Sequence, residues 1–454
     1  MTSDAEHFFT APWDPVPIRR GDALGLRGFT DELAETLAPN LTNRVVDARW
    51  VTILSWCLVR SHNAYHAADN RVVATRAQQD ERYAWLRPLE LMWVARTIQL
   101  TDPLKETLPL GLSGQRSVRR WIEGKCRAPY FGMSPDQYRA YRQTGMYGGY
   151  RVALRSWPNM TVDGDGWTPD HAVKKLADYL DKALGRARPE WGLHDLVTRR
   201  NTRNRQLEHD RWWLRRWSSY TERGRRFRDT LPQRVGPYAY LPEKEAELLQ
   251  PLIFGIDNNG KRRQLVANEI GRASAHDHLG VCEHLGKTFA DYPLIHLLPH
   301  FARLADAGMD VMDEVAQMLV VEGQTKLEPL ISGRKMRRLC QELYRAARAW
   351  KGARGARVGH IETVNRFAEA VDQSHPKDGL KGLLEHHERS GGGLRWFVLR
   401  DGSIEPRAPL QGNSSRYRFR LWPLARLATQ CRILPHMPKG LRDEYEAGEA
   451  REGD

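Results

Sequence analysis

Residues 134–184 constrain the fold of this chain more than any other stretch, because helix starts and stops follow one another closely there. Ser134 precedes a proline and stands three residues before Gln137, which is the residue order of a capped helix start. Gly145 is the next helix stop. The sequence therefore predicts a first helix between Ser134 and this glycine.

A second, arginine-bearing helix is predicted over residues 147–157, where Pro158 stops it. Residues 160–167 contain two Asp-Gly pairs, the turn chemistry of a β-hairpin. Residues 168–170 then cap a third helix with an apolar face. Helix, basic helix, hairpin and helix in this order predict a winged helix-turn-helix-like module.

The rest of the chain is predicted to be mainly α-helical, with one helix interrupted or restarted at Pro88. A β-hairpin is predicted from residues 394–400 and 403–407, which flank an Asp-Gly turn, and a further strand from residues 417–421. Apolar periodicity favours helices in the following stretches: residues 25–37, 47–59, 80–98, 115–124, 293–307, 311–321, 332–351, 362–372 and 423–433.

A chain of 454 residues is expected to hold several domains. Residues 232–251 are predicted to be a connector, with a domain boundary nearby. The expected segments are a helical platform over residues 1–130, the winged-helix-like module over 131–185, a basic segment and connector over 186–250, a helical domain over 251–390, and a C-terminal hairpin, helix and acidic tail over 391–454.

The charge of the chain favours polyanionic partners. Lys and Arg number 70 against 56 Asp and Glu, for a net charge of +14. Residues 198–228 concentrate this excess, because eleven arginines alternate there with tryptophan, tyrosine and phenylalanine. Arginine binds phosphate with a planar fork and aromatic rings stack on bases, so this tract predicts nucleic-acid binding. Residues 332–351 carry a second basic stripe.

Within the module, Arg151 and Arg155 are four residues apart and thus share one helix face, as expected of a recognition helix. A solvated basic surface and a protein-binding scaffold stay open as alternatives. The predicted nucleic-acid contacts are Arg139, Arg142, Tyr147, Tyr150, Arg151, Arg155, Arg199, Arg200, Arg203, Arg205, Arg211, Arg215, Arg216, Arg225, Arg226 and Arg228.

No catalytic residue is predicted, and an enzyme is the less favoured interpretation. Arg203, a following Asn and His209 resemble the motif of HEPN ribonucleases, in which Arg and His act on the ribose hydroxyl. The same Arg-to-His spacing recurs elsewhere in the chain, at Arg272 and His278 for example. The ribonuclease interpretation therefore stays an alternative.

No metal or other cofactor is expected. The alternative is a zinc site formed by His276, His278, Cys282 and His284, since two of these residues are four apart and would share a helix face. The spacing matches no known zinc finger, and the chain has no Cys-x-x-Cys pair.

Five scattered cysteines argue against a disulfide framework and favour a reducing compartment. The first residues have no signal-peptide pattern, and no apolar run approaches the length of a membrane span. We therefore expect a cytoplasmic protein without membrane association.

Four segments, at residues 47–58, 87–95, 141–151 and 163–169, resemble those of large uncharacterised bacterial proteins encoded beside helicase or nuclease genes in phage-defence clusters. The resemblance covers the chain up to about residue 185. It implies a DNA-binding or scaffolding component that works with a helicase or nuclease subunit, and it assigns no catalytic residue. The sequence thus predicts a non-catalytic, nucleic-acid-binding subunit of a bacterial complex, with DNA favoured over RNA.

Overall fold

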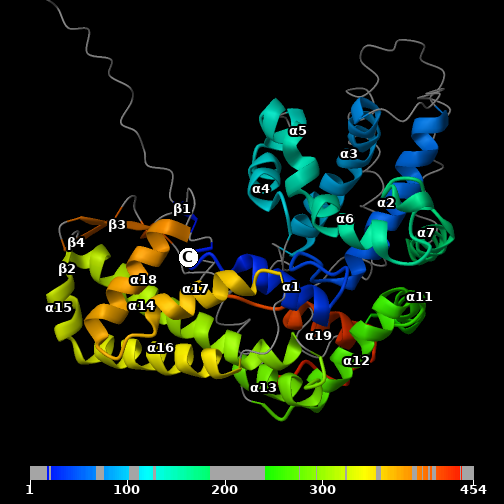
Figure 1. Ribbon diagram of the computed structural model, residues 1–454. Helices are drawn as coiled ribbons and strands as arrows, with labels where there is room; N and C mark the ends of the chain where they lie inside the picture. The colour runs from blue at the N-terminus through cyan, green and yellow to red at the C-terminus, as the bar shows by residue number, and fades with distance from the viewer. Residues whose placement is uncertain are drawn as a thin grey trace, which may run out of the picture. The chain divides into compact units, whose positions relative to one another are not determined.

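The structure is a computed structural model (Figure 1). It describes residues 18–19, 22–67, 76–101, 112–125, 129–184, 241–275, 277–292, 294–322, 325–353, 359–390, 396–400, 402–406, 410–411, 416–439 and 441.

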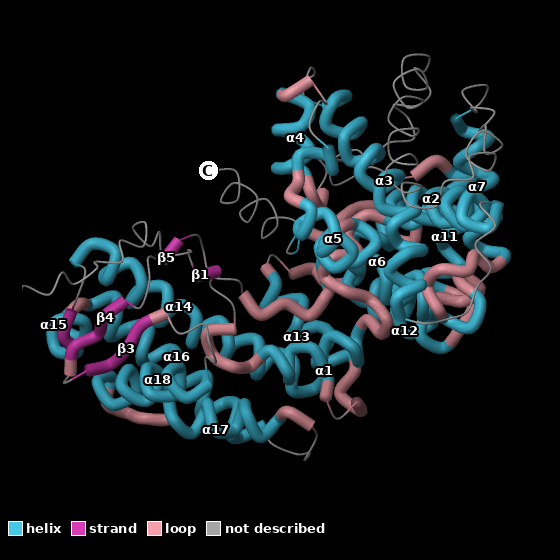
Figure 2. Tube along the Cα trace, turned by 90° about the horizontal axis from the view of Figure 1, so that it is seen from above, coloured by secondary structure: helices cyan, strands magenta, loops and turns pink. Residues whose placement is uncertain are grey.

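Helices dominate the described chain, and strands are few and short (Figure 2). This confirms the predicted mainly α fold with a small C-terminal hairpin. The residues form two compact units that are discontinuous in sequence. Unit 1 comprises residues 1–36, 273–419 and 439–454, and unit 2 comprises residues 37–272 and 420–438. This division differs from the five consecutive segments expected from the sequence.

The core of unit 2 is built on α2 (Ala48–Ala67), which packs against α3 (Arg76–Thr101) and α7 (His171–Leu184). Trp56 of α2 and Trp93 of α3 are fully buried and meet edge to face, with ring centroids 5.9 Å apart. The remaining described helices of unit 2 are α4 (Gln115–Glu123), α5 (Pro135–Thr144), α6 (Met146–Ser156), α11 (Glu243–Phe254), α12 (Asn258–Arg272) and α19 (Leu421–Gln430).

One proline-based prediction in unit 2 is wrong. Pro88 lies inside α3 and neither interrupts nor restarts it, because the helix buries Leu86 and Leu89 on either side of the proline. Core packing here outweighs the local cost of a helical proline. The described part of the predicted connector holds most of α11, which begins after Pro242 and buries Leu249 in the core.

The helix start predicted at Ser134 is confirmed. The Ser134 hydroxyl accepts a hydrogen bond from the Gln137 amide, and the Gln137 side chain accepts one from the Ser134 amide, both at 3.2 Å. This reciprocal pair satisfies two of the donors that a helix start leaves free. Gly145 alone separates α5 from α6.

The hairpin predicted over residues 160–167 is wrong. This segment forms a short 3-10 helix, Val162–Gly164, and is closed by a single β-bridge between Thr161 and Pro169. The Asp165 carboxylate accepts hydrogen bonds from the amides of Trp167 and Thr168 and from the Thr168 hydroxyl. Backbone hydrogen bonds from the Val162 amide to the Thr168 carbonyl oxygen and from the Asp170 amide to the Met160 carbonyl oxygen flank the bridge. The Asp165 side chain fixes the turn between them, as Asp does in tight turns, and no β-strand forms over residues 160–167.

Unit 1 is a layer of helices in which α14 (Leu298–Glu322) packs against α16 (Arg334–Ala353). The sequence predicted two helices where α14 runs unbroken. Gly308 lies within it, and a Cβ there would approach Leu24 and Phe367 to 2.9 Å. This glycine therefore permits close packing and does not end the helix. The other helices in the described part of unit 1 are α1 (Arg27–Leu37), α13 (His278–Thr288), α15 (Leu327–Ser332), α17 (Ile361–Val371) and α18 (Pro376–Ser390).

The predicted C-terminal hairpin is confirmed as β3 (Phe397–Arg400) and β4 (Ser403–Pro406), which pair antiparallel. Gly402 adopts a φ of 76° in the turn, a conformation that favours glycine. A third strand, β2 (Thr325–Lys326), pairs with β4. A strand of two residues is too short to be predicted from a sequence pattern. Elsewhere in the unit, β1 (Ile18–Arg19) and β5 (Leu410–Gln411) pair parallel.

The strand predicted over residues 417–421 does not form. Residues 416–419 are instead held against α14 by charges: Arg416 pairs with Asp310 and Asp313, and Arg418 pairs with Asp306. The alternation of polar and apolar residues in this segment therefore has another cause. The arginines face the aspartates of α14, and the aromatic rings between them face the core.

Two adjacent histidines of α18 join distant parts of unit 1. His386 lies 2.9 Å from the carbonyl oxygen of Leu24, and His387 lies 2.6 Å from that of Ala23. The Trp396 amide donates to the other ring nitrogen of His387, which therefore donates to Ala23 through Nδ1. This pair ties the start of the chain to its C-terminal half.

Among the described helices, none combines the length and apolar character that a membrane span requires.

Candidate nucleic-acid interface

Three of the predicted contact residues lie near one another where α5 meets α6. Arg142 is in the last turn of α5, while Arg151 and Arg155 are one turn apart on α6. We call these three residues the α5–α6 arginine cluster. Burial lowers the pKa of Arg151, and the nearby Arg155 and Arg142 lower it further. Like charges are thus held close enough to oppose one another.

Arg151 is the member of the cluster best placed to take an anion. It is half-buried, and its Nε is buried without a hydrogen-bond partner. A buried donor left unsatisfied costs free energy. Because this Nε has almost no accessible surface, a phosphate or carboxylate oxygen would be bound by the Nη donors of the same half-buried guanidinium.

Arg155 is fixed by the loop that follows α6. Its Nε and Nη2 both donate to the carbonyl oxygen of Asp165, at 3.1 and 3.0 Å. The Tyr147 hydroxyl donates to the carbonyl oxygen of Gly166, at 2.9 Å. These bonds hold the loop on α6 and leave less of the Arg155 fork for a ligand.

The two tyrosines predicted as contacts are core residues. Tyr147 is 5% exposed and Tyr150 is 1% exposed. The Tyr150 hydroxyl accepts from the Asp47 amide and donates to the Asp47 carbonyl oxygen. The apolar side of α6 turns inward and carries both rings with it, which removes them from the predicted contact surface.

Arg139 lies one turn before Arg142 on α5 and is largely exposed. Its side chain is 81% exposed, and its nearest carboxylate, that of Asp136, is 3.7 Å away and 93% exposed. Such an exposed pair contributes little and would yield readily to a phosphate.

Sequence reasoning missed a buried carboxyl group beneath the cluster. Glu90 of α3 is fully buried, and it accepts hydrogen bonds from the Tyr147 amide at 2.5 Å and the Tyr83 hydroxyl at 2.8 Å. Burial raises the pKa of Glu90 to about 7, although both hydrogen bonds and the nearby Arg87 lower it. A lone glutamate within the apolar run of residues 89–95 was the available signal.

A second missed cluster fixes the start of α2. The Asp47 carboxylate accepts from the Arg49 amide and the Gln430 side chain, and Arg426 pairs with it at 3.4 Å. Arg49 in turn pairs with buried Glu245, whose pKa is raised by burial. These groups are buried and paired with one another, so they hold α2, α11 and α19 together and offer no contact surface.

The predicted zinc ligands do not form a site in the described part of the chain. His278 and Cys282 share a face of α13, with the Cys282 Sγ 3.7 Å from the His278 Nδ1. The His278 ring stacks on Phe419, and burial lowers its pKa well below the usual value. His284 is half-buried, and His276 lies outside the described residues. No described group of three or more ligand residues lies close enough to hold a metal.

The predictions between residues 185 and 240 concern a segment outside the described residues. They are the ribonuclease pair Arg203 and His209 and the remaining contacts: Arg199, Arg200, Arg205, Arg211, Arg215, Arg216, Arg225, Arg226 and Arg228.

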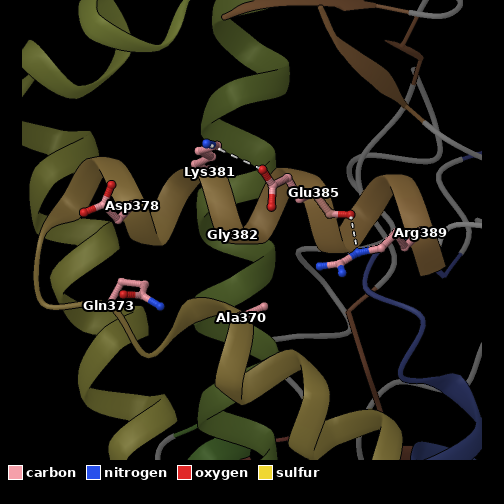
Figure 3. A pocket seen from close by; sticks show the side chains of 7 residues that line it. All are labelled: Ala370, Gln373, Asp378, Lys381, Gly382, Glu385 and Arg389. Carbon is pink, nitrogen blue, oxygen red and sulfur yellow. Dashed lines mark hydrogen bonds and ion pairs between the residues drawn. The ribbon is translucent and has the colours of Figure 1, made fainter.

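A polar hollow of about 370 Å³ lies where α17 and α18 cross (Figure 3). Lys381 pairs with Glu385 at 3.8 Å, and the Arg389 Nε donates to the Glu385 carbonyl oxygen. These are ordinary pairs along one exposed helix face, so we assign no ligand to the hollow.

Comparison of the chain with family models, with curated proteins and with solved structures finds no match. The functional assignment therefore depends on the charged surfaces described above.

Proposed function

We propose that this protein binds nucleic acid, DNA in preference to RNA, as a non-catalytic component of a larger complex. The observation that carries the proposal is the α5–α6 arginine cluster, in which three guanidinium groups lie close together and Arg151 has a buried, unsatisfied Nε. Burial and the two neighbouring arginines disfavour the charged form of Arg151. A polyanion is the partner that would offset this effect.

The chemistry of the cluster fits the phosphate backbone. Arg151 would donate to a phosphate oxygen. Arg155 is held by the loop, and its charge adds to the positive potential around Arg151. Arg139 extends the positive surface along α5. Phosphate contacts of this kind position a protein on nucleic acid and carry no sequence information by themselves.

The test is the salt dependence of binding to a 30-base-pair DNA duplex, measured by fluorescence anisotropy. Each phosphate contact removed lowers the slope of log affinity against log salt by about 0.9 for duplex DNA. We expect the double variant Arg142→Gln/Arg151→Gln to lose about 2 from that slope. Binding should weaken equally on unrelated sequences.

The matched control removes two charges from α7 of the same unit, through Lys174→Gln and Lys175→Gln, which replace exposed residues. Its slope should stay close to that of the parent. The proposal fails if the parent protein binds neither duplex nor single-stranded DNA or RNA at low salt. An RNA duplex of the same sequence tests the preference for DNA, which is overturned by equal or tighter RNA binding.

A further inference from the structure

A straight row of arginines covers the outward side of α16 in unit 1. The four residues are Arg334, Arg338, Arg345 and Arg348, and all are exposed. At 3.6 residues per turn they fall within an arc of about 80° and extend over about 21 Å of helix. We call this row the α16 arginine ridge.

The helix beneath the ridge is firmly held. Its opposite side buries Leu343, Ala347 and Trp350, and α16 packs against α14, α17 and α18, which lie beside it in Figure 1. The Trp350 indole also donates to the Asn365 side chain of α17 at 3.0 Å. The positions of the four arginines are therefore fixed before any ligand arrives, which lowers the entropic cost of binding.

Carboxylates compensate little of this charge. Glu342 is the one acidic residue on α16, and it pairs with Arg338 at 3.6 Å while both side chains stay largely exposed. The neighbouring Lys335 forms an ion pair with Glu314 of α14. Among the described residues, no carboxylate pairs with Arg334, Arg345 or Arg348.

The shape and composition of the ridge favour one kind of partner. A DNA duplex carries one phosphate of each strand per about 3.4 Å of its axis, so a ridge of about 21 Å covers roughly six base-pair steps and can face phosphates of both strands. Single-stranded nucleic acid is usually bound with exposed aromatic rings. On α16, Trp350 is buried and Tyr344 is half-buried, so the ridge offers charge without stacking surfaces.

We propose that the α16 arginine ridge is a second nucleic-acid surface, which binds the phosphate backbone of a duplex. The inference rests on the proposed function, but it concerns a different unit from the α5–α6 arginine cluster. A solvated basic helix face without a partner is the competing interpretation.

The experiment replaces all four ridge arginines with glutamine in the full-length protein and measures duplex affinity across a salt series. If every ridge residue contacts a phosphate, the slope of log affinity against log salt falls by roughly 3 to 4. The loss should be the same for unrelated duplex sequences. Thermal unfolding followed by circular dichroism checks that the variant is folded.

The control removes the same number of charges from other exposed positions of unit 1, through Arg27→Gln, Lys287→Gln, Lys381→Gln and Arg389→Gln. A ridge variant whose slope matches that of this control overturns the inference and leaves the proposed function intact. A ridge variant that loses affinity for single strands alone overturns the assignment to a duplex. Absence of all nucleic-acid binding by the parent overturns both proposals.

Discussion

The carboxyl group of Glu90 lies in the core of unit 2, between the amide of Tyr147 and the hydroxyl of Tyr83. Such a group is held more easily in its neutral form, because ionisation without water is costly. It lies at the start of α6, the helix that carries Arg151 and Arg155. The protonation of Glu90 therefore affects the hydrogen bonding at the start of the helix that carries two members of the α5–α6 arginine cluster.

The free energy of unfolding should decrease as the pH rises above 4.5, the value at which glutamate ionises in the unfolded chain. The pKa of Glu90 is raised from 4.5 to about 7 in the folded state. The folded state thus holds its proton longer, and stability is lost between these two values and stays low above pH 7. Glu90→Gln abolishes this dependence while it keeps an acceptor for the Tyr147 amide.

The difference in unfolding free energy between Glu90→Gln and the parent should change with pH. We expect it to be about 2 kcal/mol more in favour of the variant at pH 8 than at pH 5. Urea unfolding at the two pH values measures this difference. Glu247→Gln replaces an exposed glutamate of α11 and serves as the control. A Glu90→Gln effect of the same size at both pH values would contradict the assignment.

Among the helices, α17 and α18 make an unusually close crossing. A Cβ at Gly382 of α18 would lie 1.9 Å from the carbonyl oxygen of Ala370 on α17. A glycine in a helix normally costs stability relative to alanine. Its presence here is explained by the space it leaves for the neighbouring backbone.

Gly382→Ala should therefore destabilise the protein despite its better helix propensity. Forcing the two helices apart costs about 1 to 3 kcal/mol, against about 1 kcal/mol gained in propensity. Gly352→Ala in α16 is the matched control, because a Cβ there meets nothing within 4 Å. Thermal unfolding should show a lower midpoint for the first variant and an equal or higher one for the second; the reverse order would refute this explanation of Gly382.

Sequence reasoning succeeded where the deciding interactions are local. The Ser134 cap reaches only to Gln137, and the β3–β4 turn depends on Gly402 itself. It failed where a distant partner decides. The spacing of Arg151 and Arg155 predicted a shared face correctly. It could not show that Tyr147 and Tyr150 face inward, because their hydroxyl groups bond to Gly166 and Asp47, which lie 19 and 103 positions away.

At the scale of the whole molecule, the two proposed surfaces belong to separate compact units. The effects of mutations usually add when their sites are distant and share no partners. Each surface should therefore contribute its own phosphate contacts to a common affinity.

A variant that combines Arg142→Gln and Arg151→Gln with the four ridge substitutions should show the sum of the two slope changes, about 5 in all. The measurement is the same salt series on a duplex of 30 base pairs. A combined loss no larger than that of either set alone would show that the surfaces do not act on one duplex together.

The discontinuity of unit 2 has a consequence for how the protein is made. The amide of Ala48 at the start of α2 donates to the side chain of Gln430, and the carbonyl oxygen of Leu241 accepts from Arg432. Both partners emerge from the ribosome only after residues 1–419 have been synthesised. Nascent domains usually fold as they appear. We therefore expect unit 2 to complete its core only after α19 has been synthesised, so that part of its apolar surface stays exposed during elongation.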